Sequence, residues 1–140
     1  IRNVIKHMIT ISDEEMKNLL SSCFIKKFKR KEILSHPGII PNEIFFINEG
    51  LIRVLVNDPE GEEHTIHFEL ENQFIADYSC FIQQQPSLYT LQALEEVVCV
   101  VMPRSAIEWG YRELKQGDRL GRLIAEFYFI YQDNRINNQY

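Results

Sequence analysis

The sequence has little cysteine, and its three cysteines do not form a metal motif. Cys23, Cys80 and Cys99 lie far apart, with no Cys-x-x-Cys pair. The ligand spacing of zinc and iron–sulfur sites is therefore missing, and we expect reduced, packed thiols in a cytoplasmic protein. The chain also contains nothing that resembles a signal peptide or a membrane span, so we expect no contact with membranes.

An excess of positive charge is missing as well. The net charge is −5, which makes this chain a poor binder of nucleic acid by itself. Basic residues gather only between Lys26 and Lys31, where they alternate with Phe28 and precede Ile33. This pattern predicts a solvated strand edge or the exposed face of a hairpin.

The sequence does contain the signals of one β domain between helices. Its 140 residues, 45% of them hydrophobic, suit one domain with a substantial core. Ser12 and Glu15 form a capping box before an apolar helical face, which predicts a helix. Short β-type runs follow, separated by Pro, Gly and Asn-Asp-Pro-Glu-Gly turn signals. The predicted strands include residues 44–47, 51–56, 64–70, 89–94 and 97–102.

The run after the Asn-Asp-Pro-Glu-Gly turn alternates apolar and polar side chains. Alternation places Ile66, Phe68 and Leu70 on one face of a strand. His64 shares that face and His67 lies on the other, so the two imidazoles do not converge on a metal ion. We expect a partly buried His64 and an exposed His67.

Residues 71–88 lack periodicity and are rich in Gln. A loop of this length in a compact β domain usually binds something or encloses a cavity. Asp77 precedes a short helix expected at residues 78–81. We interpret it as the cap of that helix, with a carboxylate that faces a cavity as the alternative.

A long helical pattern begins near Asp118, after a short helix expected at residues 105–109. Apolar residues recur at spacings of three and four, which is typical of a helix seam. One face can pack on the β domain and another on a partner helix, so we expect a homodimer. A helix covered by its own domain alone is the alternative. The predicted dimer residues are Leu120, Leu123, Ile124, Phe127, Ile130 and Tyr131.

The order of these segments resembles the sensor half of the Crp/Fnr family of bacterial transcription regulators. The segments are EIFFINEGLIRVLV at 43–56, the hairpin at 61–70, ENQFIADYSCF from 71 and YTLQALEEVVCVVMPR at 89–104. The resemblance implies a mainly β fold with flanking helices: a jelly roll, or double-stranded β-helix, of the cyclic-nucleotide-binding β-roll type. We expect the β-roll at about 24–103 and a C-terminal dimerisation helix at about 113–137. A helix-turn-helix DNA-binding domain is expected after residue 140, in a longer chain.

Family members that bind cyclic AMP use a Gly-Glu pair for the ribose and an Arg for the cyclic phosphate. By this resemblance Ala76 and Asp77 stand for the pair, and the arginine position falls at Ser87 or Leu88. Tyr89 replaces a small residue. Losing one charge-assisted contact weakens binding roughly tenfold to a hundredfold, which disfavours cyclic AMP as the ligand. The effector-pocket candidates are Ala76, Asp77, Tyr78, Ser87, Leu88, Tyr89, Thr90, Gln92, Phe127 and Tyr131.

The sequence therefore predicts a non-catalytic domain that binds an unknown small-molecule effector and dimerises, with no metal and no cofactor. Two alternatives stay open. The substitutions at Ser87, Leu88 and Tyr89 fit equally well a docking module whose pocket has collapsed. A cupin-type metal enzyme has a similar barrel, but it needs convergent ligands, and the four histidines do not show that spacing.

Overall fold

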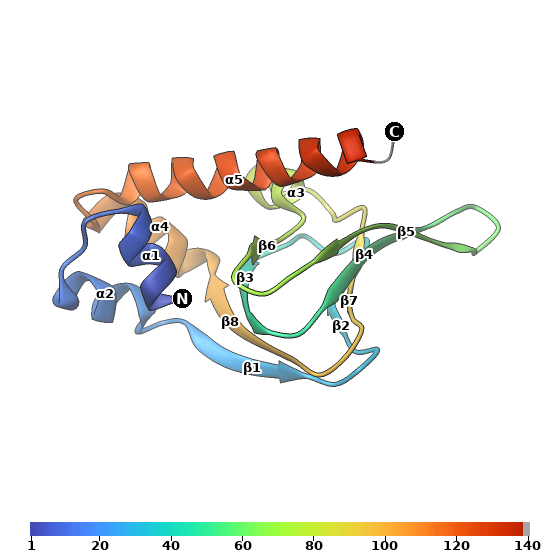
Figure 1. Cartoon of the computed structure of the whole chain (residues 1–140), viewed down its shortest axis with the longest axis horizontal. Coiled ribbons are helices and arrows are strands. Elements are labelled where there is room, and N and C mark those ends of the chain that lie inside the picture. Colours follow the sequence, from blue (N-terminus) through green and yellow to red (C-terminus); the bar gives the residue numbers. More distant parts are fainter. Residues whose placement is uncertain (139–140) are drawn as a thin grey trace.

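The computed structural model describes residues 1–138, with side chains through residue 131. Two four-stranded antiparallel sheets form a β-roll (Figure 1). The first sheet has the order β1 (Phe24–Phe28), β8 (Val97–Pro103), β3 (Glu43–Glu49) and β6 (Phe74–Ile75). The second has the order β2 (Ile33–Ser35), β7 (Thr90–Ala93), β4 (Ile52–Asn57) and β5 (Glu63–Glu69). The predicted fold class, mainly β with flanking helices, is confirmed.

Each strand predicted from the sequence is present, with bounds that differ by one or two residues. Leu94, Glu95 and Glu96 connect β7 to β8. The shortest strands, β2 and β6, were not delimited from the sequence, because runs of two or three residues carry no readable period. Both are recognisable only by the strands with which they pair.

The core between the sheets is formed by inward-facing side chains of both. β3 contributes Phe45 and Ile47, and β4 contributes Ile52 and Val54. Alternate residues of a strand share a face, so Ile52 and Val54 define the inward face of β4. The other buried members are Phe28, Ile75, Leu91, Ala93, Val97, Cys99 and Val101.

Helices cover the outer face of the first sheet and form a second core with it. They are α1 (Arg2–Met8), α2 (Asp13–Leu20), α4 (Arg104–Glu113) and α5 (Gly117–Asn138). In Figure 1, α1, α2 and α4 gather at one end of the β-roll, and α5 extends from them along its length. The buried residues of this core are Ile5, Ile9, Met16, Leu19, Phe46, Val100, Met102, Leu114 and Leu120. The first helix was missed in the sequence, because no capping residue precedes it.

The predicted capping box at the start of α2 is confirmed. Ser12 Oγ accepts from Glu15 N at 3.0 Å, and Glu15 Oε1 accepts from Ser12 N at 3.1 Å. The second carboxylate oxygen, Oε2, accepts from Lys115 N at 3.1 Å. Hydrogen bonds from Lys115 and Ser12 lower the pKa of Glu15. One side chain thus joins α2 to the segment between α4 and α5.

The long helix α5 begins at Gly117, one residue before the start that the helical pattern predicts and four after the start of about 113 that the resemblance implies, because residue 113 still belongs to α4. Its two halves have different surroundings. Leu120 is buried in the second core, and Leu123 and Ile124 pack against it. Phe127 and Ile130, by contrast, are about half exposed. The predicted seam residues therefore divide into a part that packs on its own domain and a part that is uncovered.

The basic residues near Lys26 lie on β1, an edge strand whose side chains are exposed up to Lys27. The predicted solvated edge is confirmed. Cys80 and Cys99 are buried free thiols and Cys23 is a half-buried one. Over the described residues, none of the helices combines the length and apolar character that crossing a membrane requires.

Candidate functional site

Asp77 is the centre of the site that the sequence pointed to. It follows β6 and caps α3 (Tyr78–Gln83), where its Oδ1 accepts from Cys80 N at 3.4 Å. Its Oδ2 accepts from Ser87 Oγ at 2.8 Å and from Leu88 N at 3.1 Å. The predicted cap is present, and the same buried carboxylate also closes the 77–88 loop on itself.

An interior cavity of about 90 Å³ lies beside Asp77, between the sheets and α5. Its polar lining comes from His67, Glu69, Asp77 and the two tyrosines Tyr89 and Tyr128, and the rest is apolar. Two carboxylates therefore line this cavity. Within the described part of the chain, no lysine or arginine lines it. A space of this composition favours hydrogen-bond donors and cations over anions.

The predicted burial of the two histidines was wrong. His67 points inward and pairs with Glu69 at 2.8 Å, with both side chains nearly buried. His64 is mostly exposed and pairs with Asp58. The apolar residues Phe68 and Leu70, predicted to share a face with the partly buried His64, are about half exposed.

The cause of this reversal is the register between β4 and β5. Ile52 pairs with Glu69 and Val54 pairs with His67. Residues that pair directly across a ladder share a face, so these polar side chains lie on the core face of β4. The register shifts after Val54, which leaves Ile66 as an extra residue in β5. Such a bulge reverses the alternation along a strand, and a sequence pattern alone does not reveal it.

The structure brings only some of the effector-pocket candidates together. Ala76, Asp77 and Tyr89 line the interior cavity, and Ser87 is bonded to Asp77. Leu88 is exposed. The remaining five do not line it: Tyr78, Thr90, Gln92, Phe127 and Tyr131. Tyr78 packs on Phe81 and Tyr128, and Gln92 bonds to Arg53.

The two arginines nearest to the site in the sequence are engaged elsewhere. Arg53 lies on β4 and bonds to Gln92, Thr65 and Glu63. Arg104 begins α4, where it bonds to Glu108 and to the carbonyl oxygen of Phe81. Neither lines the interior cavity, so neither replaces the arginine of the family cassette.

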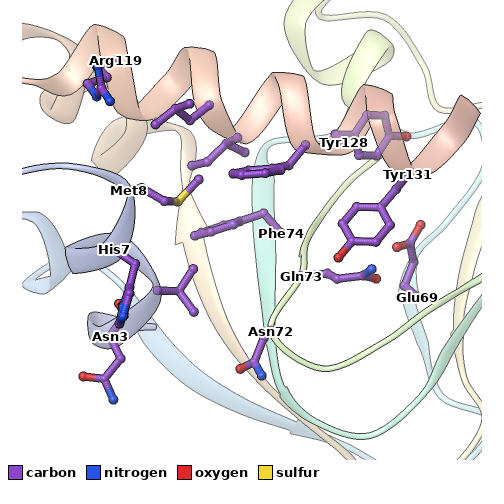
Figure 2. A pocket seen from close by; sticks show the side chains of 14 residues that line it. Asn3, His7, Met8, Glu69, Asn72, Gln73, Phe74, Arg119, Tyr128 and Tyr131 are labelled. Carbon is purple, nitrogen blue, oxygen red and sulfur yellow. The ribbon is translucent and has the colours of Figure 1, made fainter. Parts of the chain in front are cut away.

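An outer cavity of about 750 Å³ adjoins the interior one and was not foreseen as a whole. It lies between α1, the segment 69–74 and α5, and it includes the candidates Phe127 and Tyr131. Figure 2 shows Arg119 toward one end of it and Tyr128 and Tyr131 toward the other. Glu69 and Tyr128 line both cavities and form part of the wall between them.

One group of side chains has a geometry compatible with a metal ion. Asp58, Glu62 and His64 place one ligand atom each within 4.8 Å of one another at the exposed β4–β5 turn. Asp58 already accepts from Glu60 N and Glu62 N and pairs with His64, and these hydrogen bonds, the one with His64 most strongly, lower its pKa. The cluster is accounted for as an Asx-type turn.

Comparison with known proteins identifies the domain. The family model of the cyclic nucleotide-binding domain matches residues 25–113. The chain belongs to this family. It is 30% identical over 74 residues to the cAMP-activated global transcriptional regulator CRP of Salmonella typhimurium. The matched segment covers 53% of this chain and 35% of that protein. The chain thus spans about a third of the length of the curated relatives that it matches.

Two solved structures show the same fold at low identity. A cyclic nucleotide-binding domain from Methylobacillus flagellatus superposes with a TM-score of 0.80 at 19% identity, over 99% of this chain and 81% of that one. The sensor domain of the transcriptional regulator DNR from Pseudomonas aeruginosa superposes with a TM-score of 0.72 at 16% identity, over 96% of this chain and 86% of that one. The predicted Crp/Fnr-type domain is confirmed, and neither alternative from the sequence is favoured.

Proposed function

We propose that this chain is the effector-binding and dimerisation part of a cytoplasmic Crp/Fnr-type transcription regulator whose effector is not cyclic AMP. It carries no catalytic activity in this proposal. DNA binding belongs to a helix-turn-helix domain after residue 140. Membership of the cyclic nucleotide-binding domain family over residues 25–113 supports the regulatory part of this proposal.

The observation that carries the choice of effector is the charge of the interior cavity. A cyclic phosphate needs a cation or several donors, and the cavity instead presents Glu69 and Asp77. Ser87, one of the two positions where the family has its arginine, donates its hydroxyl to Asp77 rather than to a ligand. A phosphate placed here would meet Glu69 and Asp77 at low dielectric, with no lysine or arginine among the described lining residues, which opposes its binding.

The size of the cavity leads to the same conclusion. Sites for drug-sized ligands usually measure roughly 300 to 1,000 Å³, whereas this one holds about 90 Å³. Tyr89 and Tyr128 occupy part of the space between β7 and α5. A nucleotide would have to displace both rings and break the bonds of Asp77.

The dimer part of the proposal rests on the uncovered end of α5. Phe127, Phe129 and Ile130 expose between 49% and 69% of their surface within about one helical turn. Exposed apolar patches on a helix commonly mark a protein interface. A second copy that presents the same surface would cover this end in a symmetric pair.

Thermal unfolding in the presence of cyclic AMP or cyclic GMP tests the choice of effector. A ligand at about one hundred times its Kd adds roughly 2.7 kcal/mol to folding stability and raises the melting temperature by several degrees. We expect no saturable shift at millimolar concentration, while a cAMP-activated CRP measured in parallel shifts. A saturable shift that disappears in Asp77→Asn would contradict the proposal and place the nucleotide in the interior cavity.

A further inference from the structure

We propose that the outer cavity between α1 and α5 binds a long-chain carboxylic acid of the fatty-acid class. The carboxylate pairs with Arg119, and the hydrocarbon chain lies along α5 toward Tyr131. This site is separate from the interior cavity around Asp77, although Glu69 and Tyr128 belong to both walls. It therefore does not depend on the proposed response to cyclic nucleotides.

The shape of the cavity fits an elongated ligand. Its lining on α5 runs from Arg119 to Tyr131, which corresponds to about 18 Å at the helical rise. Its volume of about 750 Å³ lies within the usual range of small-molecule sites. Figure 2 shows these two side chains separated along the helix, with the other lining residues between and beneath them.

The middle of the cavity is apolar on three sides. Met8 of α1, Phe74 of β6 and Phe127 of α5 contribute side chains from three different elements. Their packing is incomplete, since Phe127 keeps 49% of its surface exposed. A hydrocarbon chain would cover this surface, and each buried methylene would add to the affinity.

The Arg119 end supplies the charge that selects an acid. Three arginines of the described residues, Arg53, Arg104 and Arg122, each form an ion pair with a glutamate. Over residues 1–131, Arg119 has no carboxylate partner, although it lines the cavity. His7 lines the same cavity, and its Nδ1 contacts Asn3 O at 2.6 Å, which leaves Nε2 for another partner. At the other end, Glu69 pairs with His67 at 2.8 Å.

The charge of Arg119 also favours a long-chain acid over the alternative occupant of this cavity, which is the α5 helix of a second copy. An apolar helix laid over the whole cavity would desolvate Arg119 without giving it a partner, which is costly. A long-chain acid would instead pair its carboxylate with Arg119 and cover the apolar lining residues with its alkyl chain. The exposed residues beyond the cavity, such as Ile130, stay available for a second copy.

Isothermal titration of the 140-residue chain with octanoate, decanoate and dodecanoate tests this site. We expect saturable one-to-one binding whose affinity rises roughly fourfold with each added methylene. Decanol, which lacks the carboxylate, should bind roughly tenfold to a hundredfold more weakly than decanoate. Arg119→Gln should cause a similar loss. Arg122→Gln is the matched control, because Arg122 lies on the same helix, pairs with Glu126 and does not line the cavity.

Three results would overturn the proposal. The first is the absence of saturable binding at millimolar acid. The second is equal affinity in Arg119→Gln and Arg122→Gln, which would mean non-specific adsorption. The third is acid binding that weakens as the protein dimerises, which would mean that a second copy occupies the cavity. Met8→Trp, with folding checked by circular dichroism, should fill the cavity and abolish binding. A stability shift with cyclic AMP would contradict only the proposed effector and leave this result unaffected.

Discussion

Gly50 is the residue at which the backbone between β3 and β4 tolerates no side chain. Its φ is +107°, a conformation that L-residues rarely adopt. A Cβ there would lie 2.7 Å from Glu96 O, in the β7–β8 connection, and 2.8 Å from Val97 Cγ2, at the start of β8. Glycine at this position therefore has two roles. It allows the chain to reverse between β3 and β4, and it allows this turn to contact the β7–β8 connection.

We predict that Gly50→Ala lowers the free energy of unfolding by roughly 2 to 4 kcal/mol, from backbone strain plus the clash. Gly61→Ala is the control, since Gly61 has a φ of +85° but no heavy atom within 4 Å of the place where a Cβ would lie. It should cost only about 1 to 2 kcal/mol. Urea denaturation of both variants measures the difference, and equal losses would show that the close approach to Glu96 is unimportant.

Cys99 carries a pH dependence that follows from its burial. Burial raises the pKa of this thiol to about 12, above its ordinary value of 9.0. The neutral thiol is thus favoured in the folded state, and its contribution to stability is complete below about pH 9. Above that pH the unfolded thiol ionises first, so stability declines until the folded pKa is reached.

We predict that ionisation of Cys99 in the unfolded state lowers the free energy of unfolding by about 2 kcal/mol as the pH rises from about 8 to about 10.5. Denaturation of the wild type and Cys99→Ala at these two pH values measures it. At the lower pH the variant is less stable than the wild type because of the space left by the sulfur. At the higher pH the difference in free energy of unfolding between the two proteins should be smaller. A gap that stays constant would contradict the buried neutral thiol.

At the scale of elements, the capping box of α2 does more than begin a helix. Glu15 caps the first turn and also accepts from Lys115 N in the α4–α5 connection. The start of α2 is therefore tied to the segment from which α5 emerges. Close packing continues there, since a Cβ on Gly117 would lie 2.1 Å from Gly110 O.

We predict that Ser12→Ala lowers the free energy of unfolding by about 1 kcal/mol, because one capping hydrogen bond to α2 is lost. Ser22→Ala is the matched control: Ser22 is an exposed serine after the same helix, and its side chain makes no hydrogen bond within the described part of the chain. It should change stability by less than about 0.5 kcal/mol. Urea denaturation compares them, and equal stabilities would mean that Ser12 caps nothing in solution.

At the scale of the whole molecule, α5 joins the β-roll to whatever follows residue 138. Its first half belongs to the helical core through Leu120, and its second half exposes Phe127, Phe129 and Ile130. Tyr128 belongs to the second half and lines both cavities. A ligand in either cavity would thus meet the helix that we propose as the dimer contact.

We predict that Ile130→Glu weakens dimerisation at least tenfold, because a charge would be buried in an apolar contact. Ile25→Glu is the control: Ile25 is 66% exposed on the edge strand β1, away from α5. Sedimentation equilibrium across protein concentrations measures both. A wild-type chain that stays monomeric at millimolar concentration, or equal dissociation constants for the two variants, would contradict a dimer through α5.

The sequence by itself determined the elements that depend on local signals. Ser12 and Glu15 mark the start of α2, and Asp77 marks the start of α3, because capping involves residues within one turn. The strands β3, β4 and β8 and the long α5 follow from their own hydrophobic period. The resemblance to a known sensor domain placed Asp77 and Ser87 at one site, and the bond between them confirms that they meet.

Only the tertiary structure decided what faces the cavities. His67 and Glu69 point inward because they pair with Val54 and Ile52, whose own direction is fixed by the core. The extra residue Ile66 changes the alternation within β5, and no local pattern marks it. The charge of the interior cavity depends on this register, and the outer cavity depends on how α1 packs against α5. Both are relations between segments far apart in the chain, whereas a sequence period reports only on the segment that carries it.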